Sequence, residues 1–357
     1  MTVVLLFLVG LAALVGGAEV LVRGASRLAL ATGLSPLVIG LTVVALGTSA
    51  PELAVGIDAV RGGSADIAMG NVVGSNITNV LLILGISALV LPLVVSRQLV
   101  RLDVPVMIGC SVLVLLLALD GTIGRWEGGL LAAVGAAYLA LQVVLGRREG
   151  NDEAPGVPAG KPGNMLLNIA MVVAGLVLLV LGAGWLVDSA VEIAGRLGVS
   201  ELVIGLTVVA VGTSAPELAT SVIAAVRGER DMAVGNVVGS CVLNLLVVLG
   251  LTAVFAPNGV PVGHAVITFD LPVMIATAVA CLPIFFTGHC IQRWEGAVFL
   301  GYYVAYTAYL LLDATGHDAQ PAFGMVMMYF VVPLTVLTLA VVLVRSLRER
   351  RAAGGVS

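Results

Sequence analysis

Two acidic residues of this sequence lie in the middle of apolar segments, and each directly follows a proline. Glu52 closes the segment GTSAPE at 47–52, and Glu217 closes an identical segment at 212–217. A carboxylate near the bilayer centre costs roughly 2.5–3.5 kcal/mol on insertion scales. Because proline lacks an N–H and clashes with the carbonyl four residues earlier, each segment predicts a broken helix whose free carbonyls and carboxylate suit a cation.

A capping box is the simpler interpretation of the same residues. Ser49 and Glu52 stand three positions apart, as do Ser214 and Glu217, and this spacing lets serine and glutamate cap a restarted helix. Serine alone would cap the helix without placing a carboxylate in hydrocarbon. Two acids at equivalent positions therefore favour a shared polar site, in which capping and cation binding are compatible.

A second polar element follows each acidic segment. It is an uncharged stripe of asparagine, serine and asparagine at every fourth position, which places the three on one helix face. The stripes are Asn71, Ser75 and Asn79, and Asn236, Ser240 and Asn244. Small residues and hydrogen bonds also pack membrane helices against each other. For Asn71 and Asn236, helix packing and cation binding explain the residue equally well. For the other four residues of the stripes, cation binding is the favoured role.

The candidate ligands of both segments are all oxygens, from carboxylates, hydroxyls, amides and backbone carbonyls. Hard cations such as calcium take about six to eight oxygens, whereas zinc and copper favour histidine or cysteine. The four cysteines have no metal-binding spacing and are expected to be free thiols. Two negative charges neutralise one divalent ion, so the residues favour calcium.

The apolar composition of the chain decides which elements must position these residues. Of 357 residues, 60% are hydrophobic and 11% are charged, and the mean hydropathy is +1.14. Soluble domains carry about 25% charged residues. We therefore expect an all-α membrane protein whose partner is lipid. A net charge of −4 with scattered basic residues predicts no nucleic-acid partner, and the sequence sets no oligomeric state.

Polar breaks divide the chain into eleven expected spans of roughly 20 apolar residues, numbered here in sequence order. They cover 2–22, 36–60, 67–93, 102–119, 126–145, 165–187, 201–226, 232–256, 267–287, 295–312 and 322–344. The first has no basic residues before it and is longer than the apolar part of a signal peptide, so we expect it to be a span.

The two halves of the chain repeat one another. GLTVVALGTSAPELA at 40–54 returns as GLTVVAVGTSAPELA at 205–219, an offset of 165 residues, and RWEG at 125–128 returns at 293–296. Between the halves, a segment rich in charge, proline and glycine predicts a cytoplasmic linker. The expected units are a first five-helix repeat over 1–145, the linker over 146–164, a second five-helix repeat over 165–313, and an extra C-terminal transmembrane helix with a basic tail over 314–357.

Five helices per repeat is an odd number, so the second repeat must enter the membrane from the opposite side. The repeats are therefore expected to be inverted. Placing the N-terminus outside puts fourteen of the 17 lysines and arginines inside and leaves Arg61, Arg125 and Arg196 outside. The positive-inside rule then predicts a multi-pass protein of the cell membrane, with the linker and C-terminus in the cytoplasm.

At these motifs the sequence resembles the cation/calcium exchanger superfamily, whose two repeats carry GTSxPE and GNxxGSNIxN. The matching segments are GNVVGSNITN at 70–79, GNVVGSCVLN at 235–244 and both GTSAPE segments, in repeats that cover ten of the eleven spans. The resemblance implies a ten-helix core that exchanges calcium for sodium by alternating access and needs no cofactor. By motif match it implies Glu52 and Glu217 as shared acidic ligands, side-chain ligands at Thr48, Ser49, Thr213, Ser214, Ser75, Ser240, Asn79 and Asn244, and carbonyl ligands at Ala45 and Ala210.

Two positions depart from the family pattern. Cys241 stands where asparagine is usual after the serine, and Asn244 stands where some sodium/calcium exchangers carry aspartate. The second difference removes a negative charge and leaves a proton-coupled or potassium-dependent calcium exchanger as the alternative function. An intramembrane enzyme is not expected, because His264, His289 and His317 fall near helix ends and form no catalytic pair. A sensor or scaffold without transport would have little reason to keep both buried acids.

Overall fold

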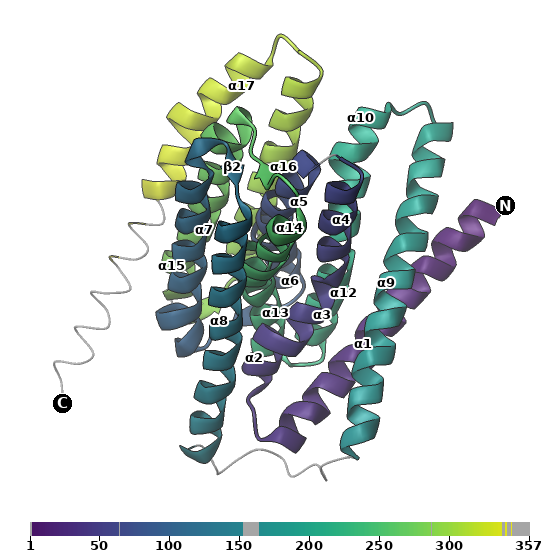
Figure 1. Cartoon of the computed structure of the whole chain (residues 1–357), viewed down its shortest axis with the longest axis vertical. Helices are drawn as coiled ribbons and strands as arrows, with labels where there is room; N and C mark the ends of the chain where they lie inside the picture. Colours follow the sequence, from purple (N-terminus) through teal and green to yellow (C-terminus); the bar gives the residue numbers. More distant parts are fainter. Residues whose placement is uncertain are drawn as a thin grey trace.

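The computed structural model describes residues 2–63, 65–152, 164–286 and 288–337, together with 340 and 344. Among these residues, ten helices are long and apolar enough to cross a membrane. A bent pair, Thr207–Thr213 with Ala215–Val226, supplies one further span. The eleven spans predicted from the sequence are therefore confirmed in number and order (Figure 1).

Each repeat comprises five spans and two short strands at their turns. The elements of the first repeat are α1 (Thr2–Thr32), α2 (Pro36–Ile39), η1 (Gly40–Val44), α3 (Ala45–Thr48), α4 (Ala50–Arg61), α5 (Ala65–Thr78), η2 (Asn79–Ile83), α6 (Leu84–Val90), β1 (Leu93–Val94), η3 (Leu99–Asp103), α7 (Val104–Leu117), η4 (Ala118–Asp120), β2 (Thr122–Ile123) and α8 (Arg125–Asp152). Those of the second are α9 (Met165–Arg196), α10 (Glu201–Ile204), η5 (Gly205–Val209), α11 (Ala210–Thr213), α12 (Ala215–Val226), α13 (Arg230–Leu243), η6 (Asn244–Val248), α14 (Leu249–Phe255), β3 (Val260–Pro261), η7 (Val266–Asp270), α15 (Leu271–Phe286), β4 (Cys290–Ile291) and α16 (Arg293–Ala314).

The two repeats cross the bundle in opposite directions. Span 2 runs from α2 up to α4, whereas span 7 runs from α10 down to α12 (Figure 1). We call the two ends of the bundle the linker end, where α8 stops and α9 begins, and the α10 end, where α10 begins. This antiparallel arrangement is the inverted repeat that an odd number of helices per half predicts.

Two short antiparallel ribbons join the repeats at their turns. The registers pair Leu93 with Ile291, Val94 with Cys290, Thr122 with Pro261, and Ile123 with Val260. β1 and β3 occupy equivalent places in the two repeats, as do β2 and β4. Exchanging the repeats therefore turns one ribbon into the other, as a pseudo-two-fold axis requires.

The repeated RWEG segments begin spans 5 and 10. In each, the glutamate accepts a hydrogen bond from the backbone N–H three residues earlier: Glu127 from Gly124 at 2.6 Å, and Glu295 from Gln292 at 2.8 Å. The first N–H groups of a helix have no partner within the helix, so these carboxylates fix where the two helices start. The motif has a structural role.

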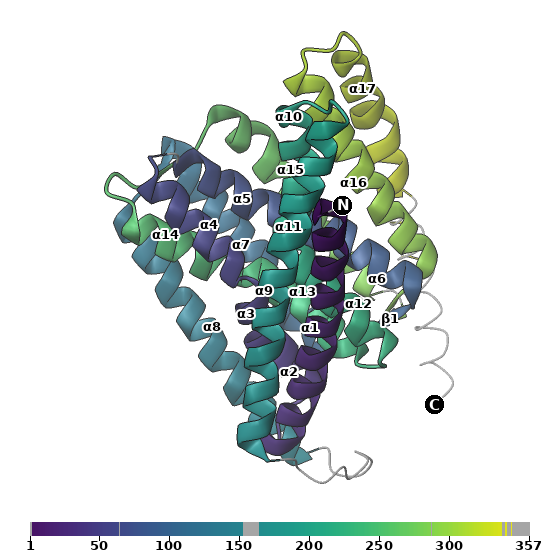
Figure 2. The ribbon, with the colours of Figure 1, turned by 90° about the vertical axis from the view of Figure 1, so that its right-hand side faces the viewer.

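α1 and α9 form a closely packed antiparallel pair along one side of the bundle (Figure 2). Their contact depends on glycine: a methyl group on Gly17 would lie 2.8 Å from Leu179 N, and one on Gly175 would lie 2.5 Å from Leu21 N. Small residues let membrane helices approach until their backbones touch. The two helices therefore form one packed unit.

Both helices of this pair are longer than their predicted spans, 2–22 and 165–187. α1 ends before Gly33 and α9 ends at Arg196, shortly before Gly198, and both glycines have positive φ, 70° and 79°, as helix C-termini often do. Arg23 and Arg27 therefore lie on α1, and their placement in a loop after span 1 was wrong. Hydropathy shows only where the apolar surface of a helix ends. The helix itself can continue further, because arginine side chains reach from it toward water.

The ends of the linker and of the chain are only partly described. α8 continues through Asp152, so the first residues of the predicted linker extend a helix. Positions 153–163 and the basic tail from 345 onward lie outside the described residues.

The extra helix begins as α17 (Gln320–Val326) and η8 (Met327–Val331) and lies against α16. The Tyr302 hydroxyl donates to Thr335 Oγ1 at 2.6 Å, and Gln320 donates to the Tyr309 hydroxyl at 2.9 Å. This helix is therefore an addition to the outside of the ten-helix core.

Candidate cation site

Spans 2 and 7 are broken at equivalent serines. Ser49 separates α3 from α4 with φ −81° and ψ 3°, and Ser214 separates α11 from α12 with φ −91° and ψ 10°. Pro51 and Pro216 lie in the first turns of the restarted helices. The helices on either side of Ser214 meet at 58°, whereas Pro36–Arg61 is a single span that Ser49 interrupts only locally. The predicted break is therefore a bend in the second repeat and a local interruption in the first.

Each break is followed by a buried carboxylate. Glu52 and Glu217 lie in the first turns of α4 and α12, and both residues are 0% exposed. None of their four carboxylate oxygens has a hydrogen-bond partner among the described residues, and neither do the buried hydroxyls of Ser49 and Ser214. The capping-box interpretation is therefore wrong, and all six oxygens remain available to another partner.

The two breaks meet across the interface between the repeats. Glu52 and Glu217 are close enough to interact electrostatically, and Thr48 lies near the Glu217 carboxylate without reaching hydrogen-bonding geometry. Thr48 Oγ1 instead donates to Asn236 Oδ1 at 3.2 Å and lies 3.5 Å from Ser240 Oγ. A hydroxyl from the first repeat therefore contacts the polar stripe of the second.

The last residue of each polar stripe opens a π-helical turn. Asn79 begins η2 and Asn244 begins η6, and both are 0% exposed. Both amide atoms of Asn79, and the Oδ1 of Asn244, have no hydrogen-bond partner in the described part of the chain. π-helical turns are rare and frequently occur at functional sites. These amide oxygens are therefore available to a cation.

Asn71 and Asn236 hold the backbone of the two glutamates. Asn71 Nδ2 donates to the carbonyl oxygen of Glu52 at 3.3 Å. Asn236 Nδ2 reaches the equivalent oxygen of Glu217 at 3.5 Å and donates to Ser221 Oγ at 3.0 Å. The sequence left packing and cation binding open for these asparagines, and the structure favours a positioning role.

The other predicted ligands are buried in the first repeat and less enclosed in the second. Ser75 is 3% exposed, and the Ala45 carbonyl accepts hydrogen bonds from Ser49 N at 3.0 Å and Thr48 Oγ1 at 3.4 Å. In the second repeat, Ser240 is buried, but Ala210 is exposed and Thr213 is only half-buried. The Ala210 carbonyl accepts from Thr213 Oγ1 at 3.4 Å. Ala210 and Thr213 are therefore less enclosed than their equivalents Ala45 and Thr48 in the first repeat.

Two polar contacts of Asn76, next to the predicted ligand Asn244, were not predicted from the sequence. Asn76 Nδ2 donates to the Cys241 carbonyl at 3.2 Å, and its Oδ1 accepts from Asn244 Nδ2 at 3.3 Å. Asn76 and Cys241 are equivalent positions, so they meet at the pseudo-two-fold axis.

A buried hydroxyl was also not predicted from the sequence. Thr220 Oγ1 is buried without a partner among the described residues, one turn after Glu217. Its three-residue spacing from the acid was the signal that could have found it.

The two ends of the bundle differ in how closely the broken spans pack. At the linker end, a methyl group on Gly40 would lie 2.7 Å from Met232 O, and one on Gly235 would lie 2.9 Å from the backbone of α2. At the α10 end, the equivalent glycines, Gly205 and Gly70, have no neighbour within 4 Å among the described residues. The linker end is therefore closed, whereas the first half of span 7 stands away from span 3.

The sequence matches the family described as "Sodium/calcium exchanger protein" over residues 2–144 and 167–312. The chain belongs to this family. The exchanger is similar to a protein described as an antiporter, CaxA, from Alkalimonas amylolytica, at 38% identity over 265 residues, 71% of this chain and 80% of that protein. It is also similar to the sodium/calcium exchanger MaX1 of Methanosarcina acetivorans, at 36% identity over 284 residues, 69% of this chain and 81% of that protein.

The fold of the exchanger matches a solved structure of the sodium-calcium exchanger NCX_Mj. The TM-score is 0.75 at 30% identity, and the match covers 86% of this chain and 98% of the other. The protein is therefore a membrane transporter and not an enzyme. Its described residues contain no group of three or more His, Cys, Asp or Glu placed to hold a metal ion.

Calcium should stabilise the purified exchanger, because a cation that binds only the folded protein raises its unfolding free energy, by about 2.7 kcal/mol at a hundredfold excess over Kd. Glu52→Gln and Glu217→Gln should each remove this effect. Both variants should unfold without calcium at or above the parent's temperature, because they remove an unpaired buried charge. Thermal unfolding with and without calcium measures both effects, and an undiminished calcium shift in either variant would contradict the site.

Proposed function

We propose that this exchanger moves calcium across the membrane in one direction and sodium in the other, at a centre shared by both repeats. The observation that carries the proposal is the pair of buried carboxylates, Glu52 and Glu217, without hydrogen-bond partners in the described chain. A buried ion without compensation costs several kcal/mol. One calcium ion neutralises both groups, and calcium prefers carboxylate and carbonyl oxygens.

The proposed ligands come in equivalent pairs from the two repeats. The two glutamates bind the same ion from opposite sides, and uncharged oxygens complete its coordination. These are the side chains of Thr48, Ser49, Ser75, Asn79, Thr213, Ser214, Ser240 and Asn244 and the carbonyls of Ala45 and Ala210. The burial of the paired glutamates, serines and asparagines around the two breaks supports this set.

Alternating access provides the transport mechanism. In the present conformation the α10 end is the looser one, and the linker end is closed by contacts at Gly40 and Gly235. Because the repeats share one sequence pattern, each can adopt the packing that the other shows here. When Gly205 and Gly70 pack against their neighbours and Gly40 and Gly235 lose theirs, the α10 end closes and the linker end opens. An ion that entered from the α10 end can then leave at the linker end.

Charge balance favours one calcium ion in the calcium-transporting step and few sodium ions in the sodium-transporting step. The centre holds two formal negative charges, because Asn79 and Asn244 are both neutral. Calcium balances them, whereas three sodium ions would leave an unpaired positive charge in a low-dielectric site. The names of MaX1 and NCX_Mj support sodium as the counter-ion, with proton or potassium coupling as the alternative.

We place the exchanger in the cell membrane with the linker end in the cytoplasm and the α10 end outside. The excess of basic residues on the linker side supports this orientation under the positive-inside rule. The conformation described here is then outward-open.

Ion-replacement flux in proteoliposomes tests the exchange directly. Radioactive calcium uptake should be driven by an outward sodium gradient and should stay near background when potassium or proton gradients replace it. Glu52→Gln and Glu217→Gln liposomes are the matched negative controls, because these changes preserve side-chain shape and remove the charge. Uptake driven by protons alone, or only with potassium present, would establish the alternative coupling.

Asn244→Asp should add a third negative charge beside the two glutamates and strengthen binding of an additional cation. The sodium dependence of calcium flux should therefore change. Repulsion from two neighbouring carboxylates favours the protonated form of the new side chain, so calcium flux in the variant should depend on pH differently from calcium flux in the parent. Calcium flux against sodium concentration at several pH values measures this, with Asn164→Asp, which adds the same charge at the exposed start of α9, as the control. Superimposable profiles for parent and Asn244→Asp would remove Asn244 from the site.

Single cysteines at the two ends test the orientation. In intact cells, Asn151→Cys at the end of α8 should be protected from an impermeant thiol reagent added outside. Val199→Cys, in the exposed turn before α10, should react. The opposite pattern would reverse the assignment of the two sides.

A further inference from the structure

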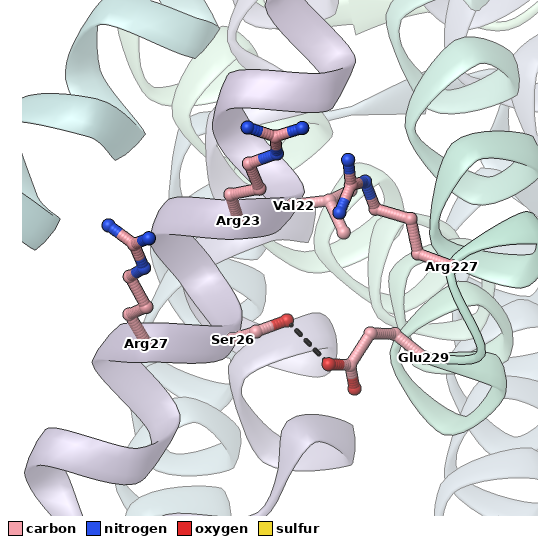
Figure 3. Close-up of a pocket in the computed structure, with 6 residues that line it drawn as sticks. All are labelled: Val22, Arg23, Ser26, Arg27, Arg227 and Glu229. Carbon is pink, nitrogen blue, oxygen red and sulfur yellow. Dashed lines mark hydrogen bonds between the residues drawn. The ribbon is translucent and has the colours of Figure 1, made fainter. Parts of the chain in front are cut away.

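A polar pocket outside the cation site joins the two repeats near the linker end. Its volume is about 360 Å³, and it lies between α1 and the turn that connects α12 to α13 (Figure 3). The lining residues are Val22, Arg23, Ser26, Arg27, Arg227 and Glu229. Four of these six side chains are charged, and none belongs to the proposed cation ligands.

Two contacts bridge this pocket from α1 to the α12–α13 turn. Arg227 at the start of the turn forms a two-point ion pair with Glu19, in which Nε donates to Glu19 Oε2 at 2.5 Å and Nη2 contacts Oε1. Glu19 also pairs with Arg23 one turn along α1 at 2.5 Å. Ser26 Oγ donates to Glu229 Oε1 at 2.8 Å, as the dashed line in Figure 3 shows.

These contacts lie across the same seam that closes the linker end. α1 leads into α2 and η1 through a three-residue turn, and the α12–α13 turn leads directly into α13. Gly40 of η1 and Met232 of α13 form the close backbone contact of that seam. Opening the linker end must separate these elements, so it must also break or displace the contacts of Glu19 and Ser26.

The positions equivalent to this ion pair and hydrogen bond at the α10 end are uncharged. At an offset of 165, Glu19 corresponds to Gly184, and Arg227 corresponds to Gly62. Ser26 and Glu229 correspond by sequence to Val191 and Ser64. The alignment is secure here because Gly228 and its counterpart Gly63 both have positive φ, 86° and 79°. Among the described residues, no ion pair joins α9 to the α4–α5 turn, whereas Glu19 and Arg227 join α1 to the α12–α13 turn.

We infer that Glu19 is a further positioning residue of the exchanger: together with Arg227 it forms a latch that holds the linker end closed and favours the state open at the α10 end. This inference rests on the proposed alternating-access function. The latch is releasable, because the side chains of Glu19 and Arg227 are 28% and 34% exposed, and a partly solvated ion pair makes only a modest contribution to stability. It changes the populations of the two states without touching the ions.

Cysteine reactivity in detergent tests the latch without any ion gradient. The background carries Cys290→Ser, because the other three cysteines are buried. Leu37→Cys reports on the closed seam, where Leu37 is 4% exposed, and Val209→Cys reports on the other end, where Val209 is 38% exposed. Glu19→Gln and Arg227→Gln should each accelerate maleimide labelling of Leu37→Cys about two- to fivefold, the factor expected for a partly exposed pair.

The controls separate a latch from general loosening. Combining Glu19→Gln with Arg227→Gln should accelerate labelling no more than the faster single change, because the two residues act through one contact. Glu192→Gln removes an ion pair within a single helix, Glu192 with Arg196 on α9, and should leave the rate unchanged. Unchanged Leu37→Cys labelling in both latch variants would overturn the inference, and so would equal acceleration at Val209→Cys. Absence of sodium-driven calcium flux in a parent with the expected labelling would instead reject the proposed function alone.

Discussion

The arrangement of the broken spans depends on two carboxylates that lie close together in the middle of an apolar bundle. Glu52 and Glu217 are fully buried, near each other, and without hydrogen-bond partners among the described residues. In a soluble protein, water or an arginine would satisfy such groups. Here the breaks at Ser49 and Ser214 carry further buried oxygens without hydrogen-bond partners among the described residues, so the described chain leaves the two carboxylates uncompensated. A cation bound between the two carboxylates would supply the missing compensation, and this links the proposed site to the proposed transport cycle.

The glycine contacts show how one sequence pattern can support two packings. Gly40 and Gly235 allow α2, η1 and α13 to touch at the linker end, whereas Gly205 and Gly70 are unused in the conformation described here. A glycine without a neighbour weakens a helix by about 1 kcal/mol relative to alanine. Its presence at Gly205 is explained if the α10 end closes in another state. α1 and α9, packed backbone to backbone, supply the rigid flank against which either end can close.

The sequence predicted the architecture well because its strongest signals are physical ones. Eleven apolar segments, an odd number per repeat and a fixed offset dictate an inverted bundle, and buried acids beside prolines mark the centre. The misses have equally physical causes. Hydropathy could not show that α1 continues through Arg23 and Arg27, because a helix does not stop where its lipid-facing surface stops. A three-residue spacing could not distinguish a cap from a binding site, since Ser49 and Glu52 fit both. The pairing of Asn76 with Cys241 depends on where the symmetry axis passes, which spacing along one chain does not reveal.

That pairing explains why a duplicated chain cannot remain identical in its two halves. A residue on the axis meets its own copy, so any side chain placed there by gene duplication must be compatible with itself. Two asparagines would bring four amide atoms to one point, whereas here Asn76 donates to the backbone of Cys241 and keeps its oxygen for Asn244. The smaller thiol leaves room for that choice. Because positions 76 and 241 are encoded separately in one chain, a mutation changes one side of this contact at a time, and the two halves can come to differ here.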